Sequence, residues 1–252
     1  MQHKKRKQYS MKENYIDIEK EYKERILKIW EEIPDNLING FEYRKFPIAP
    51  KYAKKNSLLF IGINPSFRNG AEILETEKPI GFYEFNTSIE NKDIPYFEKF
   101  KDIASYCKTD WTHLDLFFIR ESKQKLIDNL TFDNIPFLSK QLDISFEIIE
   151  NAQPKLIVVS NALASEFFGK IKKRHYAFDK IWKGYDLFFE DNECFKKTFD
   201  DSIGTYKIQI GGKSVPILFS SMLSGQRALD IGSYERLKWQ IKFVLEGKKI
   251  KY

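Results

Sequence analysis

Four short runs of mostly apolar residues are the strongest pattern along the chain. They lie at residues 58–61, 114–119, 154–159 and 215–219. No polar residue interrupts the first run, LLFI, which is typical of a strand that is buried on both faces of a sheet. Because a polar loop follows each run, the pattern predicts parallel strands that deliver polar side chains to one edge of a sheet.

The segments between these runs have the periodicity of helices. Helices are predicted at residues 12–33, 96–106, 138–152, 162–168 and 233–245. Strands that alternate with helices favour one mostly parallel sheet with helices on both faces. The sequence therefore predicts an α/β fold, with three layers in α/β/α order around a central four-stranded, mostly parallel sheet.

We predict a single domain over residues 1–252, with three additions to this core pattern. Residues 1–12 contain a run of basic residues and are expected to form a flexible arm. Residues 13–56 supply the N-terminal helix and a connector. Residues 169–212 show no clear period and are interpreted as an insertion rich in basic and aromatic side chains.

The polar loops behind the four strands form the candidate site. The carboxyl ends of parallel strands meet at one edge, and ligands of open α/β sheets bind there. The polar residues that this topology brings to the edge are Asn64, Ser66, Asp115, Arg120, Asn161 and those of segment 221–227.

Composition narrows the classes of protein to consider. The 252 residues are 42% hydrophobic, and no run approaches the 18 apolar residues of a membrane span. No apolar segment follows the basic start, so we expect no signal peptide and a cytoplasmic location. Cys107 and Cys194 are the two cysteines, which excludes a four-cysteine metal site.

Charge and aromatic content favour a polyanionic partner. The formal net charge is +6, and aromatic residues make up 15% of the chain. Basic and aromatic side chains together suit nucleic acid, because phosphates need cations and bases stack on rings. The alternative is that a composition rich in Lys, Ile and Phe reflects an AT-rich genome.

Two motifs and the segment between them resemble the uracil-DNA glycosylase superfamily. FIGINPSF, residues 60–67, resembles its first motif, and the Gly-Ile-Asn-Pro form is most similar to the mismatch-specific thymine/uracil branch. SSMLSGQ, residues 220–226, resembles the second motif, which is usually His/Asn-Pro-Ser-x-Leu-Ser. PKLIVVSNALAS, residues 154–165, resembles the strand and helix between them. The resemblance covers roughly residues 55–247.

The resemblance implies a monofunctional DNA glycosylase. Such an enzyme hydrolyses the N-glycosidic bond of a flipped-out uracil-like or modified pyrimidine base and leaves an abasic site. The family pattern implies that Asn64 orients the water and that backbone N–H groups of Ile63 and Asn64 face a base carbonyl. Asp115 is a candidate to read a base edge or to help activate water; the alternative is an aspartate that accepts hydrogen bonds from its loop. We expect slow turnover, because an amide cannot take a proton as a carboxylate can.

The same resemblance implies substrate contacts at other positions. Phe82, Tyr83 and Phe85 lie in the segment where relatives place the ring that stacks on the base. Phe85 is the candidate, and a place in the core is the alternative for each. Asn161 is a candidate to read a base edge, with a helix cap as the alternative. Leu223 falls at the position of the wedge that enters the base stack; its alternative is to cap the final helix.

Phosphate contacts are implied for three hydroxyl residues. Ser66, Ser221 and Ser224 match these positions, with helix caps as the alternative, and Arg227 is close enough in sequence to assist. DNA is therefore the expected partner, the protein is expected to be a monomer without membrane contact, and neither a metal nor another cofactor is expected.

The sequence also departs from the family. Position 219, where some branches have a catalytic histidine, is Phe219, and Ser220 replaces the expected proline; neither His113 nor His175 takes the histidine's place. Because of these departures, the sequence does not identify the base that is excised. A bulky modified pyrimidine of phage DNA is one candidate, and this substrate would imply a role in host defence. Two further classes of protein fit the same residues. One is a non-catalytic DNA-binding module of the same fold, and the other is an enzyme that acts on a free mononucleotide.

Overall fold

A computed structural model gives the structure of residues 14–66, 80–83, 95–168, 203–225 and 228–247, apart from the side chains of 130–132. Within these ranges the central sheet has five strands in the order β6-β4-β7-β9-β8. The strands are β4 (Leu58–Gly62), β6 (Trp111–Asp115), β7 (Leu156–Val159), β8 (Tyr206–Ile210) and β9 (Lys213–Phe219). β6, β4, β7 and β9 run parallel to one another, and β8 pairs antiparallel with β9 at one edge.

The apolar run of β4 is buried on both faces of the sheet. Leu58 and Phe60 belong to one hydrophobic core, whereas Leu59 and Ile61 belong to the core on the other face. Successive side chains of a strand point to opposite faces, so one unbroken apolar run supplies both cores. A shift by one residue would exchange the two sets of side chains between the two cores.

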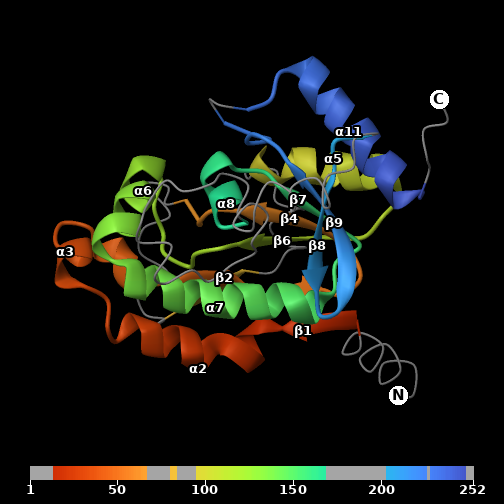
Figure 1. Cartoon of the computed structure of the whole chain (residues 1–252). Helices are drawn as coiled ribbons and strands as arrows, with labels where there is room; N and C mark the ends of the chain where they lie inside the picture. The colour runs from red at the N-terminus through yellow and green to blue at the C-terminus, as the bar shows by residue number, and fades with distance from the viewer. Residues whose placement is uncertain (1–13, 67–79, 84–94, 169–202, 226–227, 248–252) are drawn as a thin grey trace, which may run out of the picture.

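Helices cover both faces of the sheet and complete the three layers (Figure 1). α2 (Ile18–Trp30) packs against α7 (Ile135–Ala152) on one face. α5 (Glu98–Cys107) packs against α11 (Ile231–Leu245) on the other face. α6 (Gln124–Asp133) precedes α7, and the short α8 (Ala162–Glu166) follows β7.

The first 97 residues also contain several shorter elements. They are β1 (Tyr15–Asp17), α3 (Asp35–Ile38), η1 (Glu42–Lys45), β2 (Ile48–Pro50), β3 (Tyr52–Lys54), β5 (Gly81–Tyr83) and η2 (Pro95–Phe97). β1 pairs antiparallel with β3, and β2 pairs parallel with β5. The connector predicted before β4 is therefore built of short paired strands and helical turns.

The expected mixed α/β fold with a mostly parallel sheet is confirmed, but the sheet is larger than predicted. A fifth strand, β8, lies inside the range 169–212 that the sequence assigned to an insertion. Its residues alternate between buried and exposed, because an edge strand of this kind has one wet face. That alternation differs from the continuous apolar runs on which the strand prediction rested.

Several predicted boundaries were wrong, two of them by four residues or more. The second strand ends at Asp115 and does not extend to 119. The Phe117 N–H still donates to the Ile63 carbonyl at 2.9 Å, but the Phe118 carbonyl then accepts from the Ile48 N–H of β2 at 2.9 Å. The first helix begins at Ile18 and not at 12, because the Asp17 side chain caps it by accepting from the Lys20 N–H at 3.0 Å. In the described ranges no helix is long and apolar enough to cross a membrane.

Candidate functional site at the carboxyl edge of the sheet

Gly62 and Asp115 occupy the last paired positions of β4 and β6. The two residues are partners in the parallel register. A Cβ atom added to Gly62 would lie 2.1 Å from Asp115 Oδ1, so the carboxyl group occupies the space that any other side chain at position 62 would need. The glycine of the first motif is thus explained by a direct contact with a candidate catalytic group.

Asp115 lies in a buried and largely aromatic environment. Its side chain is 11% exposed, and burial raises its pKa to about 7. Burial also raises the pKa of the Tyr96 hydroxyl well above its ordinary value, with the charge of Asp115 as a further cause. His113 Nε2 lies 4.0 Å from Asp115 Oδ1, and burial lowers the His113 pKa to about 3, so the imidazole is neutral at pH 7.

The Asp115 carboxyl group is open to exchange of a proton. Among the described residues it accepts no hydrogen bond, so these residues give no support to the alternative of an aspartate held by its loop. A carboxyl group at the end of a strand whose pKa lies near neutrality has the properties of a general acid or base.

The Asn64 side chain is fixed by backbone carbonyl groups. Its Nδ2 atom lies 3.0 Å from the Pro65 oxygen, 3.2 Å from the Ile119 oxygen and 2.7 Å from the Glu121 oxygen. Carbonyl groups only accept, so the NH₂ group must face them and Oδ1 must face away. Within the described residues Oδ1 makes no hydrogen bond, and the side chain is only partly buried. Oδ1 can therefore accept a hydrogen bond from a water molecule.

The loops that carry the two glycosylase-like motifs leave the same edge of the sheet. Ile61 on β4 pairs with Val159 on β7, and Val159 pairs with Phe219 on β9. β4 and β9 are thus two strands apart, which corresponds to about 10 Å at the usual strand spacing. Asn64 and Ser221 follow shortly after these paired residues, so the two loops start within reach of one nucleotide.

The serine residues of these loops are accessible. Ser66 and Ser221 are exposed, and Ser224 is partly buried. The helix α11 is capped by Asp230, whose Oδ1 accepts from the Ser233 N–H at 2.9 Å. Ser221 and Ser224 therefore do not cap this helix, and phosphate contact remains the prediction for both. Arg227 lies outside the described residues.

Asn161 is the N-cap of α8. Its Oδ1 accepts from the Ala164 N–H and from Gln124 Nε2, each at 3.1 Å. The alternative of a helix cap is therefore confirmed. Both hydrogen bonds use the amide oxygen, so only the NH₂ group of Asn161 could donate to a base. The role of Asn161 in reading a base edge stays a prediction.

Leu223 is 1% exposed and belongs to the core cluster that also contains Leu218 and Leu237. To act as a wedge in DNA it would have to leave this cluster. Ile63 is also buried, and its carbonyl accepts from the Phe117 N–H at 2.9 Å. The candidate base-stacking residue, Phe85, lies outside the described residues.

Two residues beside Asn64 were not predicted. Arg44 and Glu121 form an ion pair in which both side chains are almost fully buried. The sequence signal was the pair of charged residues in FFIRES, directly behind an apolar run, but nothing in the sequence identifies a partner 77 positions away.

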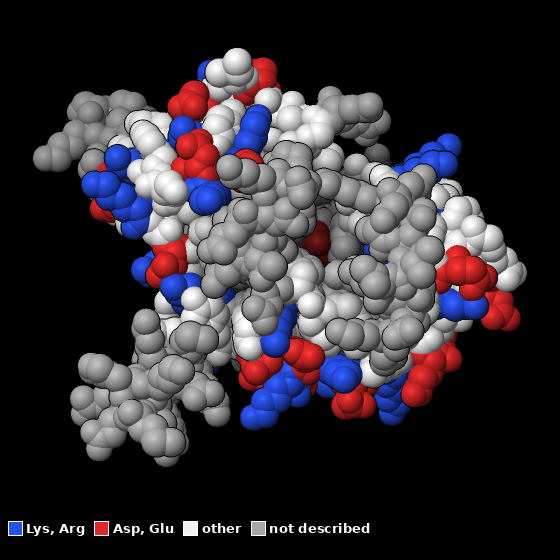
Figure 2. All heavy atoms as spheres, turned by 180° about the vertical axis from the view of Figure 1, so that it is seen from behind, with Lys and Arg blue, Asp and Glu red and all other residues white. Residues whose placement is uncertain are grey.

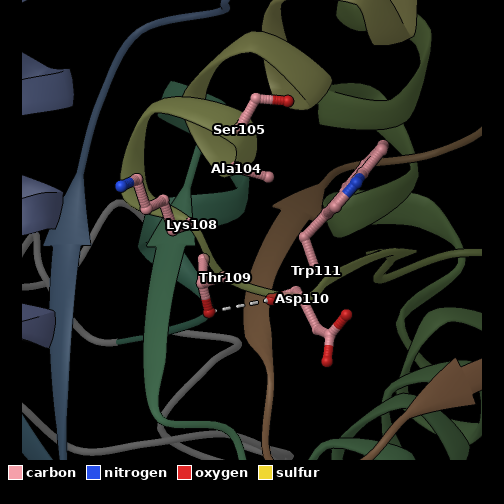
Figure 3. Close-up of a pocket in the computed structure, with 6 residues that line it drawn as sticks. All are labelled: Ala104, Ser105, Lys108, Thr109, Asp110 and Trp111. Carbon is pink, nitrogen blue, oxygen red and sulfur yellow. Dashed lines mark hydrogen bonds between the residues drawn. The ribbon is translucent and has the colours of Figure 1, made fainter.

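Neither the surface charges nor a hollow at the amino end of β6 belongs to the candidate site. On the described part of the face in Figure 2, Lys and Arg side chains lie among Asp and Glu side chains. Figure 3 shows a hollow of about 370 Å³ that Lys108, Asp110 and Trp111 help to line. Trp111 begins β6, so this hollow lies at the amino end of the strand, away from Asn64 and Asp115.

No protein-family model matches the chain, and no curated protein matches it significantly.

The contact between Gly62 and Asp115 can be tested by adding one methyl group. Gly62→Ala should lower the free energy of unfolding by about 1–3 kcal/mol, because the carboxyl group must be displaced. In an Asp115→Ala background the same change should cost clearly less. Chemical denaturation of the four proteins gives both values, and an equal cost in both backgrounds would contradict the contact.

The pKa values of Asp115 and His113 predict an unusual dependence of stability on pH. Between 3.8 and about 7 the folded state keeps a proton on Asp115 that the unfolded state has lost, so Asp115 makes stability fall as pH rises. Between about 3 and 6.5 His113 is neutral only when folded, so it makes stability rise. In the range that they share, the two effects cancel.

Asp115→Asn removes one of these opposing effects. Between pH 4 and 7, the free energy of unfolding of the variant minus that of the unmodified protein should rise by about 1.4 kcal/mol per pH unit. Urea denaturation at a series of pH values measures the difference. Curves that stay parallel over this range would show that the Asp115 pKa is ordinary.

Proposed function

We propose that this protein is a monofunctional DNA glycosylase of the uracil-DNA glycosylase superfamily, acting on a flipped-out uracil-like or modified pyrimidine. One observation carries the proposal: Asp115 pairs with Gly62 at the ends of the neighbouring strands β6 and β4, and Asn64, two residues after Gly62, has its amide oxygen directed away from the protein carbonyls. The motif resemblance supports the same assignment, since the first motif supplies both Gly62 and Asn64.

The proposed reaction is hydrolysis of the bond between C1′ and the base nitrogen. As this bond breaks, its electron pair leaves with the base and the sugar becomes a cation resembling an oxocarbenium ion. Asn64 Oδ1 holds the water that attacks C1′, and the ionised Asp115 stabilises the cation and takes the proton that the water loses. Backbone N–H groups around Ile63 stabilise the negative charge on the departing base.

The DNA contacts follow from the exposed loops. Ser66, Ser221 and Ser224 bind phosphates, with help from Arg227 and the basic arm of residues 1–12. Phe85 stacks on the base, and the Asn161 NH₂ group donates to a base carbonyl. Leu223 supports base flipping only if binding draws it out of its core cluster, which makes flipping a costly step.

A non-catalytic DNA-binding module of the same fold is the second candidate. The environment of Asp115 favours catalysis, because a buried carboxyl group that ionises near pH 7 destabilises the fold. A module that only binds DNA has no need of such a group. For a glycosylase, a bulky phage-modified pyrimidine is the alternative substrate, with a role in host defence.

Base release from defined DNA tests the proposed reaction. The protein should produce abasic sites in at least one duplex of a panel that carries uracil, mismatched thymine or phage-modified pyrimidines. Asn64→Ala should lower the single-turnover rate by about 100-fold, since the water loses its position, while DNA affinity changes little. Ser105→Ala, in the hollow at the opposite edge, is the control and should keep the rate.

The outcomes separate the two candidates. Salt-dependent DNA binding without base release from any duplex would favour the binding module. Release that is unaffected by Asn64→Ala would show that the reaction uses another group.

The proposed role of Asp115 also predicts a pH profile. Only the ionised carboxyl group stabilises the cation and accepts a proton, so the single-turnover rate should rise with pH through about 7 and then level. The Asp115→Asn variant should have a lower single-turnover rate, and this rate should no longer rise with pH. A rate that falls over the same range would instead assign Asp115 as a general acid.

A further inference from the structure

The loop that fixes Asn64 is itself fixed by a buried ion pair. The Glu121 carbonyl makes the shortest of the three contacts with Asn64 Nδ2, at 2.7 Å, and the Glu121 N–H donates to the Pro65 carbonyl at 2.9 Å. The backbone of Glu121 therefore contacts the candidate catalytic residue and also the residue that follows it.

The Glu121 side chain uses both carboxylate oxygens. Oε2 accepts from Arg44 Nε at 3.1 Å, from Arg44 Nη2 and from the Tyr43 hydroxyl at 3.2 Å. Oε1 accepts from the Lys123 N–H at 2.7 Å. Every one of these partners is a donor, so the site is built for a group that accepts on both sides.

Arg44 is held equally firmly. Its Nη1 donates to the Leu37 carbonyl at 2.8 Å, and its guanidinium carbon lies 4.0 Å from the centre of the Phe41 ring. The Arg44 carbonyl accepts from Trp30 Nε1 at 2.8 Å, which ties it to α2. The position of Glu121 is thus set by α2 and by the segment that follows it.

Stability alone gives a weak reason for such a pair. Taking both charges out of water offsets much of their attraction, and well-packed apolar residues often serve a fold equally well. What the pair supplies in addition is a fixed position for the Glu121 backbone. We propose that Arg44 and Glu121 are positioning residues that set the direction of the Asn64 amide and so of the water that it holds.

This inference rests on the proposed glycosylase function for its kinetic part but not for its structural part. The two Asn64 amide hydrogens face carbonyl groups, so they should exchange slowly with solvent. Side-chain amide exchange measured by NMR, with the Asn64 signal assigned by its loss in Asn64→Ala, tests the positioning without any assay of activity.

Glu121→Gln is the decisive variant. One end of a glutamine amide donates, so in either orientation an NH₂ group meets a donor, from Lys123 or from Arg44. The Asn64 amide hydrogens should then exchange at least about 10-fold faster than in the unmodified protein. Single-turnover base release should slow about 10-fold, with less than a twofold change in DNA affinity.

Two controls separate positioning from a general loss of stability. Glu147→Gln removes the same charge from the exposed pair with Arg25 and should leave exchange and rate unchanged. Ile210→Ala, a buried position of the edge strand β8, should lower the midpoint of urea denaturation without an effect on the rate at a temperature where the variant is folded. If Glu121→Gln does not fold, Arg44→Lys provides the test, since lysine cannot reproduce the guanidinium contacts.

A double-mutant comparison completes the test. In an Asn64→Ala background, Glu121→Gln should change the rate less than twofold, because the residue through which it acts is absent. An equal loss in both backgrounds, or fast exchange of the Asn64 amide in the unmodified protein, would overturn the inference. If the protein releases no base from any DNA, the proposed function fails while the exchange measurement still decides the positioning.

Discussion

The contact between the Asp115 carboxyl group and Gly62 is the constraint that holds the candidate site together. It requires β4 and β6 to stay in register, it forbids a side chain at position 62, and it buries a carboxyl group where water has little access. The raised pKa of Asp115 follows from that burial. A buried carboxyl group of this kind lowers the stability of the fold at pH 7, and pKa shifts of this size are common at functional positions.

The sequence predicted most of the scaffold because its signals are local. The apolar run of β4 and the polar residues after it identified both an interior strand of the sheet and the candidate residue Asn64. The end of β6 and the edge strand β8 were missed for physical reasons. Residues 116–119 are as apolar as a strand, yet they are buried in a loop, and β8 alternates as a strand with one wet face does.

The details of the site depend on contacts that sequence does not encode locally. Asn161 was a candidate for base reading and serves as a helix cap, and Leu223, the candidate wedge, lies in a core. The pair of Arg44 and Glu121 joins residues that are 77 positions apart. In each case a residue type was visible in the sequence, but its partner was supplied by the fold.

The proposed reaction requires the paired ends of β4 and β6 to hold a sugar that becomes cationic. Duplex DNA with a cationic pyrrolidine in place of one deoxyribose imitates that state, and the ¹³C signal of the Asp115 carboxyl group reports its ionisation. Binding of this DNA should lower the Asp115 pKa by at least about one unit, because a nearby cation favours the carboxylate. DNA with a neutral abasic site should have a smaller effect. An Asp115 pKa that is unchanged when the cationic DNA is bound would contradict the proposed role of this carboxyl group.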